Sequence, residues 1–174
     1  MICNNLSTCV EEKLNDRKCS CDHPDVCVEV EDTRSNIKCE EKGKSYVLQN
    51  PNREKVLLYK IDGGVIVQDA TFLPETCKCD YMFTNKERMV VLVELKGKDV
   101  SHALDQIDGT LDIFKQFFKS CSVVYGRAVV ASATPRLAAT PQFTKLWKKL
   151  KALNGDLKVS EMHMIENMRE LSLS

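Results

Sequence analysis

Several short segments after residue 44 are apolar runs bounded by polar residues, and this pattern predicts a β-sheet. The segments 45–50, 55–68 and 79–83 are rich in β-branched and aromatic residues and are bounded by turn-forming residues, as strands are. The second segment contains a Gly-Gly pair and is predicted to be a hairpin or a bent strand. Residues 89–97, MVVLVELKG, are apolar on both faces, which is typical of a central strand.

The period then changes to that of an amphipathic helix. From residue 99 to residue 118 apolar residues recur three or four positions apart, which predicts a helix of about five turns that Asp99 caps and a glycine near its middle weakens. Beyond it the pattern predicts a strand at 122–134, a helix at 140–155 and a last strand at 156–163. This order predicts an α/β fold in which a central mixed sheet is flanked by helices.

Residues 1–40 differ from the rest of the chain because they hold six of the nine cysteines and show no clear apolar period. We predict one domain over residues 1–174, with this Cys-rich N-terminal segment packed on a core formed by residues 44–174. Four residues of the segment could surround a zinc ion: Cys19, Cys21, His23 and Cys27. Their C-x-C spacing departs from the C-x2-C pairs of structural zinc sites, so thiols without metal are the favoured interpretation and zinc is the alternative.

Composition and charge narrow the classes of function. The chain of 174 residues carries 25 basic and 25 acidic residues, so it has no overall field that would draw it to nucleic acid or to an anionic membrane. It has no long apolar run and no cationic start followed by an apolar stretch, which predicts a cytoplasmic protein with no membrane partner. Any attraction to a polyanion must therefore be local.

A polar pair stands near the end of the apolar strand at 89–97. Residues two apart in a strand point the same way, so Glu94 and Lys96 project from one face. Asp80 belongs to the preceding predicted strand, and a hairpin between the two strands would place its carboxylate beside that of Glu94. Two carboxylates this close disfavour ionisation unless a cation lies between them. A hard divalent cation such as Mg²⁺ would supply that charge, and Lys96 could orient an attacking water or neutralise charge that develops on a phosphate.

The spacing of these three residues, D-(x13)-E-x-K, resembles the motif of the PD-(D/E)-x-K superfamily, the restriction-endonuclease-like phosphodiesterases. The resemblance covers about residues 44–135, with Cys79 in the place of the motif's proline. It implies a restriction-endonuclease-like fold and a nuclease that hydrolyses phosphodiester bonds in DNA or RNA with Mg²⁺ or Mn²⁺. It also implies the metal ligands and the supporting catalytic residues, which are Asp80, Glu94, the carbonyl of Leu95, Lys96 and Gln106.

Two further acids are candidates for the same site. The resemblance implies an upstream acid, which the sequence does not fix among Glu40, Glu41 and Glu54, and we retain Glu41 as a possible additional ligand. Asp62 could add a ligand from a neighbouring strand, although an Asp before Gly-Gly more often begins a turn.

Other interpretations of the same residues stay open. The acidic pair and Lys96 could form a solvated edge with an incidental ion pair. The fold could also serve as a non-catalytic module that binds nucleic acid or another partner. The lysines of the helix predicted at 140–155 could form a solvated face or line a path for a phosphate backbone. A homodimer is compatible with a chain of this size.

Overall fold

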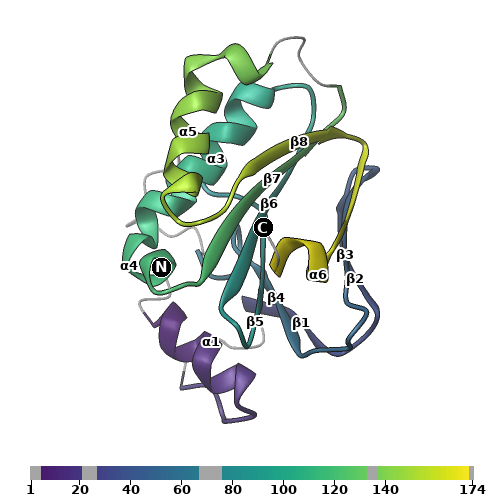
Figure 1. Cartoon of the computed structure of the whole chain (residues 1–174), viewed down its shortest axis with the longest axis vertical. Coiled ribbons are helices and arrows are strands. Elements are labelled where there is room, and N and C mark those ends of the chain that lie inside the picture. The colour runs from purple at the N-terminus through teal and green to yellow at the C-terminus, as the bar shows by residue number, and fades with distance from the viewer. Residues whose placement is uncertain (1–4, 21–26, 67–75, 133–136, 173–174) are drawn as a thin grey trace.

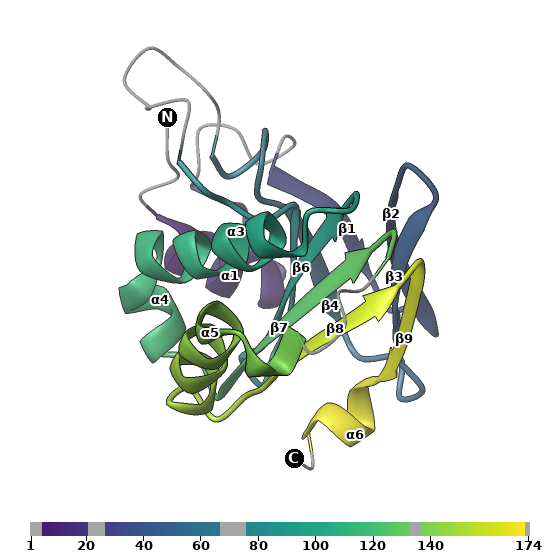
Figure 2. The ribbon, with the colours of Figure 1, turned by 90° about the horizontal axis from the view of Figure 1, so that it is seen from above.

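The computed structural model describes residues 5–20, 27–66, 76–132 and 137–172. It is a mixed α/β structure with three layers, in which helices cover one face of a six-stranded mixed sheet and a three-stranded sheet covers the other (Figures 1 and 2). The predicted central mixed sheet flanked by helices is therefore confirmed. The sequence did not predict that a second sheet covers the opposite face.

The six-stranded sheet has the strand order β1-β4-β5-β6-β7-β8. Its strands are β1 (Val28–Asp32), β4 (Val56–Lys60), β5 (Tyr81–Asn85), β6 (Met89–Lys96), β7 (Val123–Val130) and β8 (Leu157–Glu161). Neighbours from β1 to β6 are antiparallel, whereas β7 lies parallel to β6 and β8 parallel to β7. In the segment predicted as a hairpin or bent strand, β4 ends at Lys60 and the chain turns through Gly63, which has a φ of 79°.

The three-stranded sheet consists of β2 (Asn36–Glu41), β3 (Lys44–Gln49) and β9 (His163–Asn167). β2 and β3 form a hairpin, and β9 runs parallel to β3. The chain passes from the large sheet to the small one at Met162, which has a φ of 56°. The N–H of Met162 donates to the Val130 carbonyl at 2.9 Å, and its carbonyl accepts from the Ser45 N–H at 3.0 Å. Met162 therefore connects β8, an edge strand of the large sheet, to β9, an edge strand of the small sheet.

Among the described residues, the helices that pack on the other face of the large sheet are α1 (Leu6–Leu14), α3 (Val100–Ile113), α4 (Lys115–Lys119) and α5 (Pro141–Lys151). The prediction of one continuous helix over 99–118 is wrong, because α3 ends at Ile113 and α4 begins after Phe114. A short turn, η1 (Leu137–Ala139), precedes α5, and α6 (Met168–Ser172) follows β9. None of the helices in the described ranges combines the length and the apolar character needed to cross a membrane.

Residues from the Cys-rich N-terminal segment take part in every layer. α1 packs on the helix side of the large sheet, β1 pairs with β4, and β2 pairs with β3. The prediction that residues 1–40 have no clear apolar period is wrong for α1. Its buried residues follow helical spacing once Cys9 counts as an apolar position: Leu6, Cys9, Val10 and Leu14.

The central strand β6 packs against both layers, which explains its apolar sequence. Val90 and Leu92 belong to the core on the helix side, whereas the residues that alternate with them, Val91 and Val93, face the three-stranded sheet. Glu94 and Lys96 continue the row of Val90 and Leu92. Their polar groups therefore stand where the helix-side core ends.

Helix α3 lies close to the segment that leads into β5. The Cys79 N–H donates to Thr110 Oγ1 at 2.8 Å, and Gln106 Nε2 donates to the Lys78 carbonyl at 3.0 Å. Gly109 lies beside these contacts, and a Cβ at this position would overlap the Cys77 carbonyl oxygen. The glycine that interrupts the predicted helix therefore permits the backbone of 77–79 to approach α3.

We expect Gly109→Ala to lower the free energy of unfolding by about 1–3 kcal/mol, because α3 and the 77–79 segment would have to separate. At a helix position without such a contact, the same change would stabilise by about 1 kcal/mol. Urea unfolding followed by circular dichroism measures the difference. Gly97→Ala is the matched control, since a Cβ at Gly97 meets no atom within 4 Å. A more stable Gly109→Ala protein would contradict the proposed role of this glycine.

Candidate functional site

A pocket of about 610 Å³ lies where β5 begins and β6 ends. Its lining brings together the residues that were predicted for the magnesium site, with Glu41 as the retained upstream acid: Glu41, Asp62, Asp80, Glu94, Leu95, Lys96 and Gln106. The sequence did not indicate the remaining lining residues, which are Lys42, Lys44, Lys60, Tyr81 and Gly97. Three of these are lysines from the β2–β3 hairpin and the end of β4, so basic residues line the pocket around the acidic corner.

The two carboxylates that were predicted to meet lie opposite each other. β5 and β6 pair in the register that joins Tyr81 to Val93, which places Asp80 across from Glu94. The Leu95 N–H donates to Asp80 Oδ2 at 2.8 Å, and the backbone of Asp80 donates to the Glu94 carboxyl group. The N–H and C=O of a strand residue point to the same side. The Leu95 carbonyl therefore faces the Asp80 side, where the two carboxylates are.

Burial makes this corner unfavourable for negative charge. Glu94 is 1% exposed, and its Oε2 atom is buried without a hydrogen-bond partner. Burial, followed by the charge of Asp80, raises the pKa of Glu94 to about 9, although Lys96 opposes the shift. Burial also raises the pKa of Asp80 to about 6, and the carboxylates of Glu41 and Asp62 add to the shift. A cation at this corner would favour the ionised form of both groups.

A hard divalent cation fits this set of donors. Mg²⁺ and Mn²⁺ prefer oxygen ligands, which the Asp80 and Glu94 carboxylates and the Leu95 carbonyl provide. Within the part of the chain that the structure describes, no three His, Cys, Asp or Glu side chains converge closely enough to hold a metal by themselves. A cation at this corner would therefore complete its coordination with water, as Mg²⁺ commonly does.

Lys96 is held in place by helix α3. Its Nζ donates to Gln106 Oε1 at 2.8 Å, and the amide nitrogen of Gln106 donates to the Lys78 carbonyl. Gln106 is only 8% exposed and lies one turn before Thr110, whose hydroxyl donates to the Gln106 carbonyl at 2.9 Å. One helix thus fixes both the Lys96 ammonium and the backbone that leads to Asp80.

Of the three candidate upstream acids, Glu41 lines the pocket. Strand residues alternate in direction, so its neighbour Glu40 points outward, where it is exposed and forms an ion pair with Lys38. Glu54 belongs to a turn in which its N–H donates to Asn50 Oδ1 at 3.0 Å. The β2–β3 hairpin, which the sequence did not place near β6, is what brings Glu41 to the site.

Asp62 lines the same pocket from the turn after β4. Its carboxylate forms an ion pair with Lys78 at 3.4 Å, and the Lys78 side chain is 6% exposed. Removing the Asp62 carboxylate would leave the nearly buried ammonium of Lys78 without this ion pair. Asp62 therefore has a structural role in the turn beside its predicted role as a ligand.

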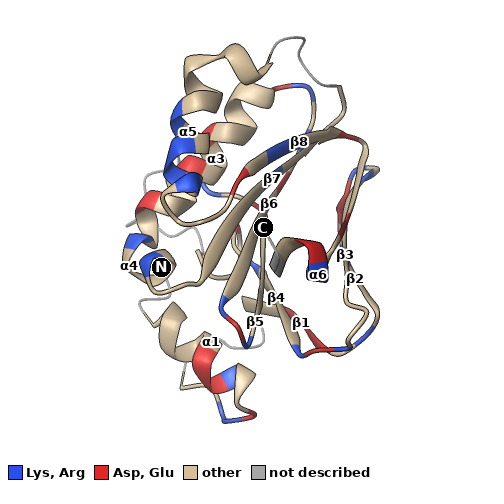
Figure 3. Cartoon of the chain, viewed as in Figure 1, with Lys and Arg blue, Asp and Glu red and all other residues tan. Residues whose placement is uncertain are grey.

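The lysines of α5 do not line the pocket, and two of them pair with α3. Lys145 contacts Asp108 at 2.9 Å, and Lys149 contacts both Asp108 and Asp112. In Figure 3 basic positions, in blue, and acidic positions, in red, are present on these two adjacent helices. The pairs favour the interpretation of α5 as an amphipathic helix with a solvated charged face over a path for a phosphate backbone.

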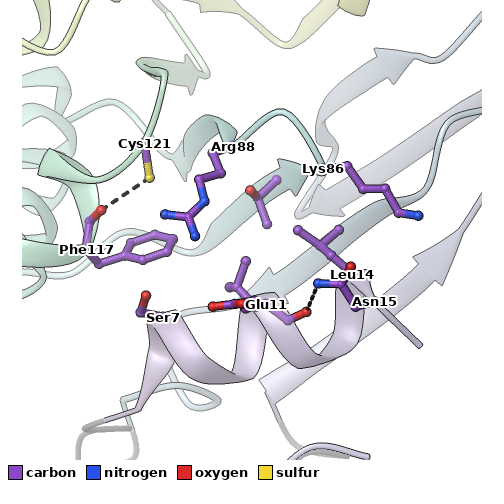
Figure 4. A pocket seen from close by; sticks show the side chains of 10 residues that line it. Ser7, Glu11, Leu14, Asn15, Lys86, Arg88, Phe117 and Cys121 are labelled. Carbon is purple, nitrogen blue, oxygen red and sulfur yellow. Dashed lines mark hydrogen bonds between the residues drawn. The ribbon is translucent and has the colours of Figure 1, made fainter. Parts of the chain in front are cut away.

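A second cavity, of about 310 Å³, lies between α1, the β5–β6 turn and Phe117 (Figure 4). Arg88 and Glu11 line it, together with Cys121, whose thiol donates to the Phe117 carbonyl at 3.4 Å. Burial raises the pKa of Cys121 to about 11, so its thiol stays protonated at neutral pH and is a poor nucleophile. None of the residues predicted for the site lines this cavity.

Two of the four residues named for the zinc alternative, Cys19 and Cys27, are described, and both lie outside the pocket. Cys21 and His23 lie outside the described residues. Cys19 and Cys27 are buried in the helix-side core, where Cys19 contacts Cys9. Whatever these thiols do, they do not line the pocket at Asp80 and Glu94.

No family model, no curated protein and no solved structure matches the chain. Its function must therefore be argued from the geometry and electrostatics of the pocket.

Proposed function

We propose that this protein is a metal-dependent nuclease that hydrolyses phosphodiester bonds in DNA or RNA. The observation that carries the proposal is the buried pair of carboxyl groups, Asp80 and Glu94, with an unpartnered Glu94 oxygen. Burying two carboxyl groups together lowers the stability of a fold that makes no other use of them. A divalent cation that binds to the pair would compensate its charge. The lysines that line the same pocket carry the charge that attracts the phosphates of a nucleic acid.

The order of elements supports an assignment to the PD-(D/E)-x-K superfamily. Helix α1 comes before an antiparallel meander, β4–β5–β6, that carries the three motif residues at its β5 and β6 end. Helix α3 then carries Gln106 and leads to β7, which is parallel to β6. The resemblance implies the order helix, three strands, helix and strand, and this chain has that order with β1, β2 and β3 inserted between α1 and the meander.

Five residues of the pocket have a defined role in the proposed reaction. Mg²⁺ or Mn²⁺, held by Asp80, Glu94 and the Leu95 carbonyl, would polarise the phosphodiester and lower the pKa of a bound water. Lys96 would orient the attacking water and stabilise the charge that develops on the phosphate. Gln106 limits the positions that the Lys96 ammonium can take, because it accepts a hydrogen bond from Nζ.

We expect Lys96→Ala to lower the rate of cleavage about 100-fold or more, because the variant loses the group that stabilises developing charge. The affinity for Mn²⁺ should change little, since Lys96 is not a ligand. The assay follows cleavage of labelled single-stranded DNA, double-stranded DNA and RNA in the presence of Mg²⁺ or Mn²⁺. Lys98→Ala is the matched control, because Lys98 is exposed and does not line the pocket.

Two outcomes would count against a nuclease. If Lys96→Ala cleaves as fast as the wild type, the cleavage arises elsewhere or from a contaminant. If the wild type binds Mn²⁺ and nucleic acid but cleaves none of the three substrates, the pocket belongs to a non-catalytic binding module on the same fold.

A further inference from the structure

Two cysteine sulfur atoms are in contact in the helix-side core, away from the proposed nuclease site. Cys9 lies in the middle of α1, and Cys19 follows the helix in the loop that returns over it. The Cys19 thiol lies 2.9 Å from Cys9 Sγ. Cys9 is 1% exposed and Cys19 is 8% exposed, so the pair is enclosed but Cys19 is nearer to solvent.

The loop after α1 is held in a conformation that keeps Cys19 over Cys9. The backbone N–H and the hydroxyl of Ser20 both donate to Glu12 Oε2, at 2.8 and 3.0 Å. The Arg17 N–H donates to the Glu12 carbonyl at 2.8 Å. These bonds fold residues 17–20 back onto the helix. The two sulfur atoms would need to move by only about 1 Å to reach the covalent S–S distance of about 2.05 Å.

The separation of the two sulfur atoms favours a disulfide over a shared metal. Two thiolates on one tetrahedral zinc ion lie about 3.7 Å apart, because each Zn–S bond measures about 2.3 Å. The contact between Cys9 and Cys19 is already shorter, at 2.9 Å. The hydroxyl of Tyr59 lies 3.4 Å from Cys9 Sγ on the side of β4, so the pair is also linked to the central sheet.

We propose that Cys9 and Cys19 are a redox-sensitive pair that a peroxide converts to an intrachain disulfide. The more accessible Cys19 thiol gives up its proton as its sulfur attacks one peroxide oxygen and the O–O bond breaks, which leaves a sulfenic acid; the departing hydroxide takes up that proton and, for hydrogen peroxide, leaves as one water. The Cys9 sulfur then attacks the sulfur of this sulfenic acid, and the proton of Cys9 leaves with the hydroxyl group as a second water. The two sulfur atoms are oxidised and the peroxide is reduced. This inference does not depend on the proposed nuclease activity.

The disulfide would tie the loop after α1 covalently to the helix. Closing the ring between Cys9 and Cys19 restricts the unfolded chain, so oxidation should raise the melting temperature by roughly 5 °C. A thiol reductant should reverse the shift. The pair would thereby couple the stability of the N-terminal helix to the supply of peroxide.

The test uses the full chain, reduced and then treated with hydrogen peroxide. Remaining thiols are alkylated, the protein is digested, and the peptides are mapped by mass spectrometry. We expect a cross-linked pair of peptides that contain Cys9 and Cys19, lighter by two hydrogen atoms than the separate peptides, together with the reversible rise in melting temperature. Cys19→Ser should lose both signals, whereas Cys121→Ser, a half-buried cysteine outside the pair, should keep them.

Three results would overturn the proposal. The first is that Cys9 and Cys19 both still react with the alkylating reagent after a peroxide treatment that oxidises Cys121. The second is a cross-link that joins either of them to a different cysteine. The third is zinc that copurifies with the wild type, is lost in Cys19→Ser and protects both thiols from peroxide. The mapping on the wild type stands by itself if Cys19→Ser fails to fold.

Discussion

Replacing Glu94 by glutamine is expected to abolish Mn²⁺ binding at the pocket and to stabilise the protein in the absence of metal. The substitution keeps the shape of the side chain but removes a ligand charge, so cleavage that depends on the metal should fall by at least about 100-fold. The same change removes a carboxyl group that is 1% exposed and has an unpartnered oxygen. Loss of metal binding together with a gain in stability is typical of a functional site and not of a structural ion pair.

The gain in stability should depend on pH in a defined direction. The pKa of Glu94 is about 9 in the folded protein, against an ordinary value of 4.5, so the folded state holds its proton more tightly than the unfolded state. The contribution of Glu94 to the free energy of unfolding is then most favourable below about pH 4.5 and falls as the pH rises to about 9. At pH 7 and in the absence of metal, the ionisable carboxyl group of Glu94 lowers the free energy of unfolding by about 3 kcal/mol. Glu94→Gln should show no such slope from this group.

Calorimetric titration of Mn²⁺ and urea unfolding at pH 5, 7 and 9 measure the two effects in parallel. Glu40→Gln is the matched control, because Glu40 is exposed on β2 and points away from the pocket. It should leave Mn²⁺ affinity and the pH slope unchanged. A Glu94→Gln protein that binds Mn²⁺ like the wild type, or that is less stable than the wild type at pH 9, would remove the basis of the proposed metal site.

The corner at Asp80 and Glu94 was predictable because short-range rules determine it. The two-residue period of a strand fixes which side chains share a face, and the length of the turn between the strands fixes the register that sets Asp80 opposite Glu94. Gln106 was placed only by the resemblance. Its contact with Lys96 depends on how α3 packs against β6, which the apolar period of the helix indicates only in part.

The three-stranded sheet could not be predicted in the same way, because its pairing joins distant segments. β3 pairs with β9, so Ser45 lies beside His163. No local pattern in either segment indicates that it pairs with the other. Glu41 reaches the pocket from this sheet. Helix α1 was not predicted for a different reason: Cys9 is one of the four positions of its buried face, so the helical period is visible only when cysteine is counted as an apolar residue.

Replacing Arg127 by methionine is expected to lower the free energy of unfolding by about 3–5 kcal/mol, a large part of the stability of most domains. Arg127 lies on β7, fully buried, with its Nε donating to Glu166 Oε2 at 2.5 Å and its Nη1 to Asp156 Oδ1 at 2.6 Å. The hydroxyl of Tyr46 on β3 donates to the same oxygen of Glu166 at 3.0 Å. The guanidinium therefore links the large sheet to the small one.

The cost arises from what Arg127→Met leaves behind. Glu166 has a pKa below its usual value: burial opposes this, but the bonds from Arg127 and Lys158 outweigh it. Without the guanidinium, the carboxylate of Glu166, whose side chain is 9% exposed, keeps its charge in the interface between the sheets and loses its main partner. Urea unfolding at neutral pH measures the loss.

Two further variants separate this cause from a general effect of altered packing. Lys158→Met removes the other cationic partner of Glu166, but Lys158 is 56% exposed, so this change should cost at most about 1 kcal/mol. The double variant Arg127→Met, Glu166→Gln removes the stranded charge and should be more stable than Arg127→Met alone. A single Arg127→Met variant within 1 kcal/mol of the wild type would show that apolar contacts alone hold the two sheets together. Equal stability of the single and double variants would show that the lost packing of Arg127, and not the charge of Glu166, sets the cost.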